Sequence, residues 1–530
     1  MSREIVTRTP EDTILRPRWP WRVVVAAWVR RHNTALIVVG MIASLAYYYL
    51  IPANLLALPG LLVFFALTWR RLDLALCVLP LAFPFWYVPK RFYGYRVLPL
   101  SEIGLLVCLA VALARETRHV RVGLDHARVW TRAYLLCRRV GAWPVVGAAL
   151  LFVGMTVGVA VASYPHVALR AYRWEIAEPL LYALGVLLYV RGRAALGLLL
   201  WSFLAAATLL AALAILQSLA IHQTFSPLAQ GNRLVAYGAG PGPAPAATGI
   251  VLGSGNSLGA WIERALPLAL ALGLRGRGAS RRSQWAAWLC AAICCLALYW
   301  SGSRGAWLGA TVGCLVVVVV YARNRWVPLA LGVIVVALAL WRRGVIWQAL
   351  LNGHHGTGSL RLLLWLAGLK MIRDHPILGF GPDQFLYHYS SLYTAHPYWV
   401  TKLNGKPTIA STQPTLAHPH NLLLELWISG GILAVLGMAA LLWAFWRRCA
   451  RLWRAVGAAA RDERSIWAAT VALGLAGAMA ATVVHGMVDS AYFVPDLALI
   501  FWMMVALLIG LARLEPARRN ILRLSRESPV

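Results

Sequence analysis

The sequence predicts an all-α polytopic integral membrane protein with about 12–14 transmembrane helices, and two observations carry this prediction. First, 60% of the 530 residues are hydrophobic and only 13% are charged, which is typical of neither a soluble domain nor a disordered chain. Second, apolar runs close to membrane-spanning length recur along the chain. Each must be helical, because lipid offers its backbone no hydrogen-bond partner.

The apolar segments run through the whole chain, and each is expected to form one helix. They cover residues 34–51, 53–69, 73–89, 98–114, 143–164, 173–190, 194–221, 257–274, 285–300, 305–321, 326–341, 421–446, 465–484 and 492–513. Several are shorter than the roughly 20 residues that span a bilayer, and Pro80 and Pro84 interrupt the third. Twelve spans with two half-inserted segments are therefore an alternative.

The basic residues lie between the apolar segments. The chain has 50 lysines and arginines against 19 acidic residues, which gives a formal net charge of +31. Their clusters occupy every second connection, for instance residues 115–139, 275–282 and 447–454, as the positive-inside rule requires. The charge therefore indicates topology and contact with anionic membrane lipids, not binding to nucleic acid. It also predicts that both termini are cytoplasmic.

Together these patterns predict five regions. They are a cytoplasmic N-terminal tail (1–33), an N-terminal transmembrane bundle (34–341), a large periplasmic loop (342–420), C-terminal transmembrane helices (421–513) and a cytoplasmic tail (514–530). The first tail has no apolar stretch leading to a small-residue cleavage site, so no signal peptide is expected.

The cysteines predict neither disulfides nor a metal centre. None of them falls on a connection predicted to face outward, where oxidation would favour a disulfide. Cys290, Cys294 and Cys295 are spaced like metal ligands, but in an apolar helix such residues are more often packing residues.

Residues 342–420 form the only long polar interruption of the chain. Ser359 is expected to cap a helix over 360–372, and this run should lie along the membrane interface because it is apolar but carries Arg361 and Lys370. Residues 386–411 are rich in Tyr, His, Thr and Ser. Such residues often hold sugars by stacking and hydrogen bonding, although for any single tyrosine ordinary placement at the membrane interface is the commoner role. The loop is thus expected to contain short interfacial helices and a polar, aromatic rim.

His420 ends this loop, directly before the next apolar segment. Histidine titrates near neutral pH and can take a proton from a nucleophilic hydroxyl group. The commoner role at this position is to cap or to bridge at the start of the helix that follows. His418 and His420 could instead hold a metal ion, but no third ligand has suitable spacing, so no metal site is predicted.

Two more polar groups lie on connections predicted to face outward. Arg304 stands between Ser303 and Gly305 at the start of a helix, where its guanidinium and the helix dipole favour an anion. The alternative for Arg304 is snorkelling to lipid phosphates. His485 and Asp489 are spaced as partners on one helical face, although Asp489 could simply bond to a helix end.

In this order, these residues resemble the O-antigen ligase and polymerase superfamily, and most closely its O-antigen ligases. The resemblance covers about residues 230 to 440 and rests on a series of short motifs. They are Arg233, Asn256 with Leu266-Pro267-Leu268 after it, Ser303-Arg304-Gly305, Arg361 with Trp365, Gly379-Phe380-Gly381-Pro382, and His420-Asn421 with Gly430-Gly431 after it. Each motif is weak alone, but their order and shared outward placement make the likeness specific.

The resemblance implies an inverting glycosyltransferase without a metal ion or other cofactor. Its donor would be an O-antigen glycan on undecaprenyl pyrophosphate at the periplasmic face of a Gram-negative inner membrane, and its acceptor would be lipid A–core oligosaccharide. By the same resemblance, His420 would be the general base, and Arg304 and Arg361 would stabilise the departing pyrophosphate. The residues that would help to bind substrates are Arg233, Asn256, Trp365, His418 and Asp489.

Other functions remain open at this stage. A polymerase would extend another donor-linked repeat, and a protein O-oligosaccharyltransferase would modify serine or threonine. The aromatic loop with basic Lys370, Arg373, Lys402 and Lys406 favours the anionic lipid A–core. A transporter for an anionic lipid-linked substrate is the alternative of another class. It is the weaker interpretation, because the span centres are nearly free of charge and no repeat is visible.

Overall fold

The computed structural model describes most of the chain. The described residues are 20–86, 89–92, 95–96, 98–121, 126–222, 255–275, 280–322, 357–389, 393, 400–403, 406–409, 418–458 and 462–514. Arg233 and the predicted span 326–341 lie outside them.

Nearly all of the described residues are helical. The helices are α1 (Pro20–Leu50), α2 (Asn54–Arg70), α3 (Leu72–Val78), α4 (Leu100–Arg121), α5 (His126–Val140), α6 (Ala142–Val161), α7 (Pro165–Tyr172), α8 (Glu178–Tyr189), α9 (Gly192–His222), α10 (Gly255–Leu274), α11 (Arg281–Ser301), α12 (Arg304–Ala322), α15 (Thr357–Asp374), α16 (Phe385–His388), α17 (Leu422–Ala458), α18 (Glu463–Gly486) and α19 (Pro495–Ala512). The short turns are two 3₁₀ helices, η1 (Leu79–Leu81) and η2 (Phe83–Phe85), and one π-helical turn, η3 (Arg173–Ala177).

Two short antiparallel hairpins complete the described structure. They consist of β1 (Arg91–Phe92) with β2 (Tyr95–Arg96), and of β3 (Val400–Leu403) with β4 (Lys406–Ile409). The second hairpin lies in the large loop, where the sequence predicted only helices and a polar rim, and Val400 faces Ile409 in its register.

The prediction of an all-α polytopic membrane protein is confirmed. Within the described residues, nine helices are long and apolar enough to cross a membrane, namely α1, α6, α9, α10, α11, α12, α17, α18 and α19. The expectation of one continuous helix over 73–89 was wrong. Here α3 ends at Val78 and the two 3₁₀ turns follow, because Pro80 and Pro84 have no N–H to donate.

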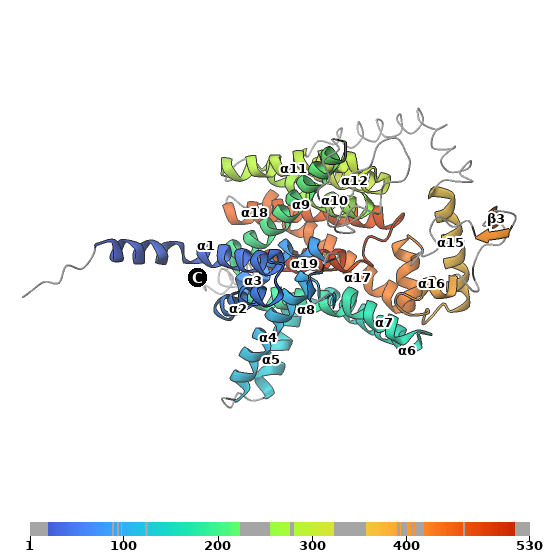
Figure 1. The fold of residues 1–530 in the computed structure, drawn as a ribbon, viewed down its shortest axis with the longest axis horizontal. Helices are drawn as coiled ribbons and strands as arrows, with labels where there is room; N and C mark the ends of the chain where they lie inside the picture. The colour runs from blue at the N-terminus through green and yellow to red at the C-terminus, as the bar shows by residue number, and fades with distance from the viewer. Residues whose placement is uncertain are drawn as a thin grey trace, which may run out of the picture.

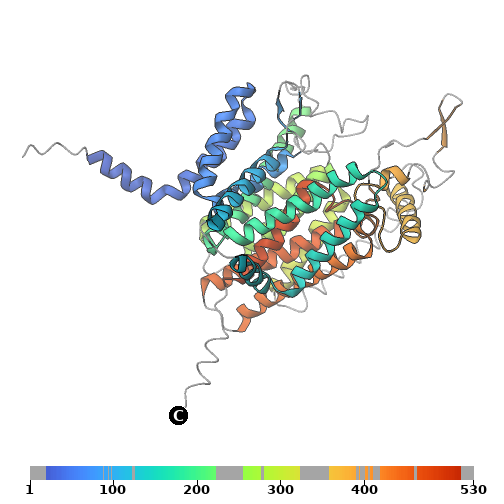
Figure 2. The ribbon, with the colours of Figure 1, turned by 90° about the horizontal axis from the view of Figure 1, so that it is seen from below.

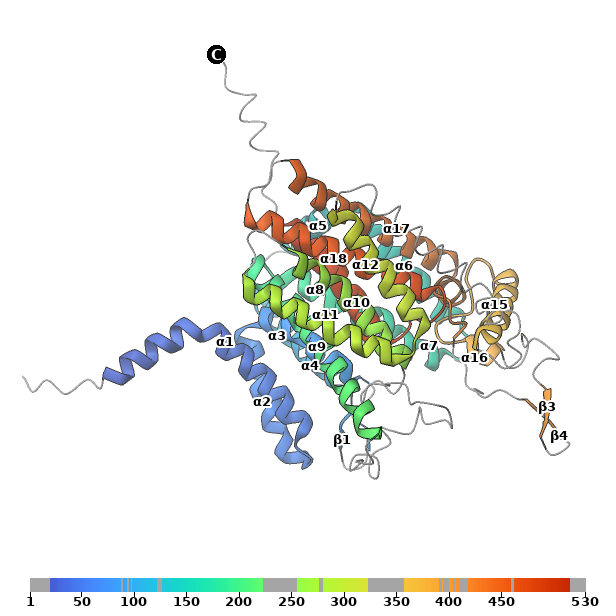
Figure 3. The ribbon, with the colours of Figure 1, turned by 90° about the horizontal axis from the view of Figure 1, so that it is seen from above.

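The helices pack around α19, whose residues 495–511 are all buried. Helices α8, α9, α17 and α18 contact it, while α10 packs between α11, α12 and α18. Helices α15 and α16 and the β3–β4 hairpin lie together at one end of the bundle (Figures 1 and 3). The chain leaves α19 at the opposite end (Figure 2). We call the end that carries α15 the loop end.

Helix α17 is interrupted at Gly431, where the segment after α15 inserts into it. Gly431 has φ +62°, and a Cβ atom there would lie 1.9 Å from the carbonyl oxygen of Ile377. That carbonyl accepts a hydrogen bond from Ile432 N at 3.0 Å, and Phe380 N donates to Ile428 O at 2.7 Å. The loop thus replaces hydrogen bonds that the broken helix cannot make for itself.

Gly431→Ala is expected to lower the free energy of unfolding by at least about 2 kcal/mol, because it combines a left-handed backbone with a clash against backbone atoms. Thermal denaturation of the purified protein would measure the loss. Gly197→Ala is the matched control, since its Cβ would meet only the Trp467 ring at 3.9 Å. Equal melting temperatures for the two variants would contradict the prediction.

Candidate active site

Asp489 joins three distant segments at the loop end. It follows α18 directly, and its Oδ1 lies 2.8 Å from Nδ1 of His420 and accepts from Ser490 N at 2.8 Å. Its Oδ2 accepts from Nη2 of Arg361 on α15 at 3.2 Å. The structure therefore brings together Arg361 and His420, which lie far apart in the large loop, and Asp489 from another connection.

Asp489 is held in its ionised form. Burial would raise the pKa of its carboxyl group, but the hydrogen bond from His420 and the charges of His420, His485 and Arg361 outweigh burial and hold that pKa well below its usual range. An ionised carboxylate only accepts hydrogen bonds, so Nδ1 of His420 must carry the shared proton. In the neutral ring, Nε2 is then the proton acceptor.

The backbone at His420 is left-handed, just before α17 begins. His420 has φ +51°, and Trp365 Nε1 on α15 donates to its carbonyl oxygen at 3.4 Å. Asn421 caps α17 instead, since its Oδ1 accepts from the N atoms of Leu423 and Leu424 at 3.0 and 3.1 Å. The alternative that His420 caps the helix was therefore wrong.

A second layer of charged residues lies behind Asp489. His485 Nε2 is 3.9 Å from Asp489 Oδ2, and His485 Nδ1 is 2.9 Å from Oε2 of Glu263 on α10. Glycines on α12 make this close approach possible. A Cβ atom at Gly305 would lie 2.7 Å from the His485 ring, and one at Gly309 would lie 2.6 Å from the Glu263 carboxylate.

The expectation that span centres are nearly free of charge was wrong for α10. Glu263 and Arg264 lie in the middle of this helix and are fully buried. Arg264 is satisfied by Thr482 Oγ1 at 2.9 Å and by the carbonyl oxygens of Ala260 and Ala491. The charges persist there because Glu263 pairs with His485 and Arg264 donates hydrogen bonds to these three oxygen atoms, which offsets the cost of burial.

Arg304 is the first residue of α12 and is exposed. The next residue, Gly305, lies against His485, so Arg304 stands at the edge of the same cluster. No ion pair involves Arg304 among the described residues. The N-terminus of α12 adds its positive dipole, and together they favour an anion there.

His418 belongs to a neighbouring ion pair. Its Nδ1 lies 2.7 Å from Oε1 of Glu425 on α17. Burial alone would lower the pKa of His418, but Glu425 raises it by charge and hydrogen bonding, and Glu175 and Asp383 add to this effect. The net result is a pKa of about 9 for His418, so the ring is cationic at neutral pH.

The His418–Glu425 pair is expected to make stability fall as the pH rises from about 6.5 to about 9. A histidine with a raised pKa in the folded state stabilises it fully below its unfolded pKa, near 6.5, and this contribution is lost as the pH passes the folded value of about 9. The loss is on the order of 3 kcal/mol. His418→Gln should flatten the profile of melting temperature against pH, whereas replacing exposed His166 with Gln should leave it unchanged. A wild-type slope in the His418 variant would refute this assignment.

The remaining predicted residues occupy less central places. Trp365 reaches the site through its bond to His420. Asn256 lies in the first turn of α10, seven residues before Glu263 and hence on the same face of that helix. Arg233 falls outside the described residues.

Sequence reasoning missed Glu263, Glu425 and Glu175, all of which are buried. The signal for the first two was available, because a carboxylate within an apolar helix marks a functional site by default. Among the described residues, no group of three or more His, Cys, Asp or Glu side chains is arranged to hold a metal ion.

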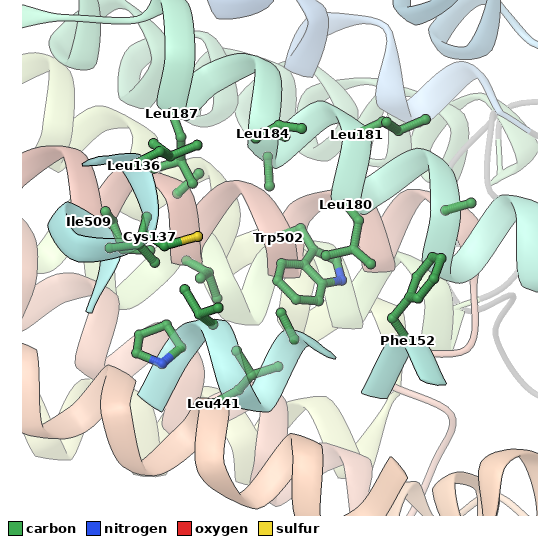
Figure 4. Close-up of a pocket in the computed structure, with 18 of the residues that line it drawn as sticks. Leu136, Cys137, Phe152, Leu180, Leu181, Leu184, Leu187, Leu441, Trp502 and Ile509 are labelled. Atoms are coloured by element: carbon green, nitrogen blue, oxygen red, sulfur yellow. The ribbon is translucent and has the colours of Figure 1, made fainter. Parts of the chain in front are cut away.

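A cavity of about 560 Å³ runs along α8 between α5, α6, α17 and α19, with an almost entirely apolar lining. Figure 4 shows Leu136 and Cys137 at one end, Phe152 at the other and Trp502 between them. Tyr172, just before the π-helical turn η3, and Ala177, its last residue, both line it. Such a lining suits hydrocarbon chains.

Comparison with known proteins supports the resemblance. Residues 289–439 match the family model described as O-antigen ligase. This segment includes Arg304, Arg361, Trp365, His418 and His420, while Glu263 and Asp489 lie outside it. No curated protein matches the chain. The match supports ligase- or polymerase-type activity on lipid-linked polysaccharides.

Proposed function

From the membership of residues 289–439 in the O-antigen ligase family, we propose that this protein is an inverting, metal-independent glycosyltransferase. It transfers O-antigen polysaccharide from undecaprenyl pyrophosphate to a sugar hydroxyl of lipid A–core oligosaccharide. The observation that carries this proposal is the hydrogen bond from His420 Nδ1 to Asp489, beside the Arg361–Asp489 pair. It supports a site in which a proton acceptor, His420, and a cation, Arg361, share one carboxylate.

In the proposed reaction, His420 Nε2 takes the proton of the acceptor hydroxyl while its oxygen attacks the anomeric carbon of the donor. A carbon–oxygen bond forms on one face of the sugar, and the bond to pyrophosphate breaks on the other, which inverts the configuration. Asp489 orients the ring and balances the positive charge that His420 gains.

Arg304 and Arg361 receive the negative charge that grows on the pyrophosphate. Guanidinium groups match phosphate oxygens geometrically and stay charged at all working pH values, so they can replace a divalent metal ion. Arg361 shares Asp489 with His420 in the substrate-free structure, and its side chain is 26% exposed, which leaves it accessible to an anion.

The basic connections support an orientation in which both termini are cytoplasmic and the loop end faces the periplasm of a Gram-negative cell. Ligase activity is preferred over polymerase or protein O-oligosaccharyltransferase activity. Lys370 and Arg373 are exposed on α15, and Lys402 and Lys406 lie on the β3–β4 hairpin. They suit an anionic acceptor.

Complementation of a ligase-deficient Gram-negative strain tests the proposal. A restored lipopolysaccharide ladder supports ligase activity, whereas glycosylated pilin without a ladder indicates a protein transferase. With purified donor and acceptor, transfer should continue in EDTA. Loss of transfer that a divalent ion restores would refute metal independence.

A transporter for an anionic lipid-linked substrate is the second candidate, and the buried charges Glu263 and Arg264 on α10 favour it. Transfer by the detergent-solubilised protein decides between the two functions, because it needs no sealed compartment. Movement of substrate across sealed vesicles without any transfer would favour transport.

A further inference from the structure

A second, polar pocket of about 240 Å³ adjoins the candidate active site. His418 lines it, two residues before His420, so the pocket borders the segment that carries the proposed base. The lining residues are Trp86, Arg170, Ala171, Trp174, Glu175, Asp383, His418, Phe493, Val494 and Pro495. Most of them precede or follow the segment that matches the family.

The π-helical turn η3 (Arg173–Ala177) supplies two of these residues, Trp174 and Glu175. Single π-helical turns within α-helices occur frequently at functional sites, because the extra residue redirects side chains that a regular helix would place elsewhere. Here α7 leads into η3 and α8 continues from it, so the turn interrupts one long helical path.

Two side chains of the pocket have polar atoms without a hydrogen-bond partner among the described residues, Trp174 at Nε1 and Glu175 at its carboxyl group. The Glu175 side chain lines the pocket although the residue is only 9% exposed, and no hydrogen bond or ion pair within the described residues involves its carboxyl group. The other charges are paired, since Arg170 lies 3.4 Å from Asp383 and His418 bonds to Glu425. A buried carboxyl group without a partner is costly unless a ligand bonds to it.

The rest of the lining identifies the kind of ligand. The rings of Trp86 and Trp174 meet edge to face, with centroids 5.9 Å apart, and the Arg170 guanidinium lies 5.6 Å from the Trp174 ring. The two cations of the lining, Arg170 and His418, are each paired with a carboxylate, which disfavours a phosphate, and the polar groups disfavour a hydrocarbon chain. Aromatic faces next to hydrogen-bonding groups suit a neutral ring that has an apolar face and several hydroxyls.

We propose that this pocket binds one hexopyranose ring of the glycan that takes part in transfer, with Trp174 against the ring and Glu175 accepting hydrogen bonds from its hydroxyls. The segment that contains Asp383 forms one wall of the pocket and is hydrogen-bonded to the start of α7. Gln384, beside Asp383, accepts from Tyr164 N at 2.9 Å and donates to Tyr164 O at 3.3 Å, which ties the loop to the start of α7. The assignment of this ring to a substrate of the transfer reaction rests on the proposed function.

Binding can be tested without transfer. The full-length protein in nanodiscs, free of glycoside detergents, is mixed with methyl α-D-glucopyranoside or methyl α-D-galactopyranoside, and saturation-transfer-difference NMR is recorded. At least one of the two probes should bind the wild type. Glu175→Ala and Trp174→Leu should each weaken binding about tenfold, the loss expected for one buried hydrogen bond or one aromatic face.

Conservative variants separate recognition from folding. Trp174→Phe should restore most of the binding that Trp174→Leu loses, and Glu175→Gln should retain more binding than Glu175→Ala, because an amide still bonds to hydroxyls. Leu181→Ala, which alters the apolar cavity instead, should bind like the wild type. Equal binding by the wild type, Glu175→Ala and Trp174→Leu, or no binding of either probe, would overturn the proposal.

Steady-state transfer then identifies the source of the ring. A rise of about tenfold in KM for the acceptor, with kcat and donor KM unchanged, assigns the pocket to the acceptor, while a selective rise in donor KM assigns it to the donor. A fall in kcat alone in Glu175→Ala and Trp174→Leu would contradict a binding role. If the wild type binds the sugars but transfers nothing, the proposed function fails and the pocket assignment stands.

Discussion

His420→Ala is expected to reduce glycan transfer by about 10²- to 10⁴-fold while the protein remains inserted and folded. The variant removes the proton acceptor whose Nδ1–H is held by Asp489 at 2.8 Å. The His420 side chain is 26% exposed, and Asn421 rather than His420 caps α17. The loss of the imidazole should therefore cost little stability. Transfer from a purified lipid-linked donor, with melting temperature measured in parallel, checks both halves of the prediction.

The matched control is His375→Ala, which removes an exposed histidine from the same loop. It should transfer at close to the wild-type rate. Transfer at the wild-type rate by the His420 variant would remove this residue from the mechanism, whatever its position in the structure.

Asp489→Asn is expected to lower kcat by about 10²- to 10⁴-fold with little change in acceptor KM. The amide is uncharged, so it cannot balance the charge that His420 gains, and it can present an N–H to Nδ1 and thereby favour the wrong tautomer. Asp489 is a positioning residue, because it acts through His420 and Arg361.

Asp489→Glu serves as the conservative variant and should recover part of kcat, since it restores the negative charge at a slightly different position. A purely structural role predicts instead that kcat follows the melting temperature in both variants. Equal kcat values for Asp489→Asn and the wild type would show that the charge is dispensable.

From apolar spacing and basic clusters, the sequence predicts that His420, Arg361 and Asp489 lie on the same side of the membrane, and this stays a prediction. Their convergence on one carboxylate could not be predicted, since it depends on the packing of α15, α17 and α18. The structure also explains two glycines of α12. Gly305 and Gly309 lie so close to His485 and Glu263 that a side chain would not fit at either position.

Other features depend on local backbone geometry, which the periodicity of apolar residues does not reveal. The helix expected to begin at Leu360 with Ser359 as its cap in fact begins at Thr357, so that prediction was wrong by one turn. The π-helical turn at Arg173–Ala177 differs from an α-helix by one residue per turn, and its apolar pattern is almost the same. The break at Gly431 requires a loop far along the chain to fill it.

That break also limits how α15 can move. Its C-terminal end continues into the segment hydrogen-bonded within α17, whereas near its N-terminal end α15 is held by contacts of Arg361 and Trp365. Arg361 lies about 20 Å along the helix from Asp374, near the end of α15 that is farther from Gly431. A pyrophosphate bound to Arg361 would compete with Asp489 for the guanidinium, whereas the packing of Leu364, Ala367 and Met371 against α17 would remain.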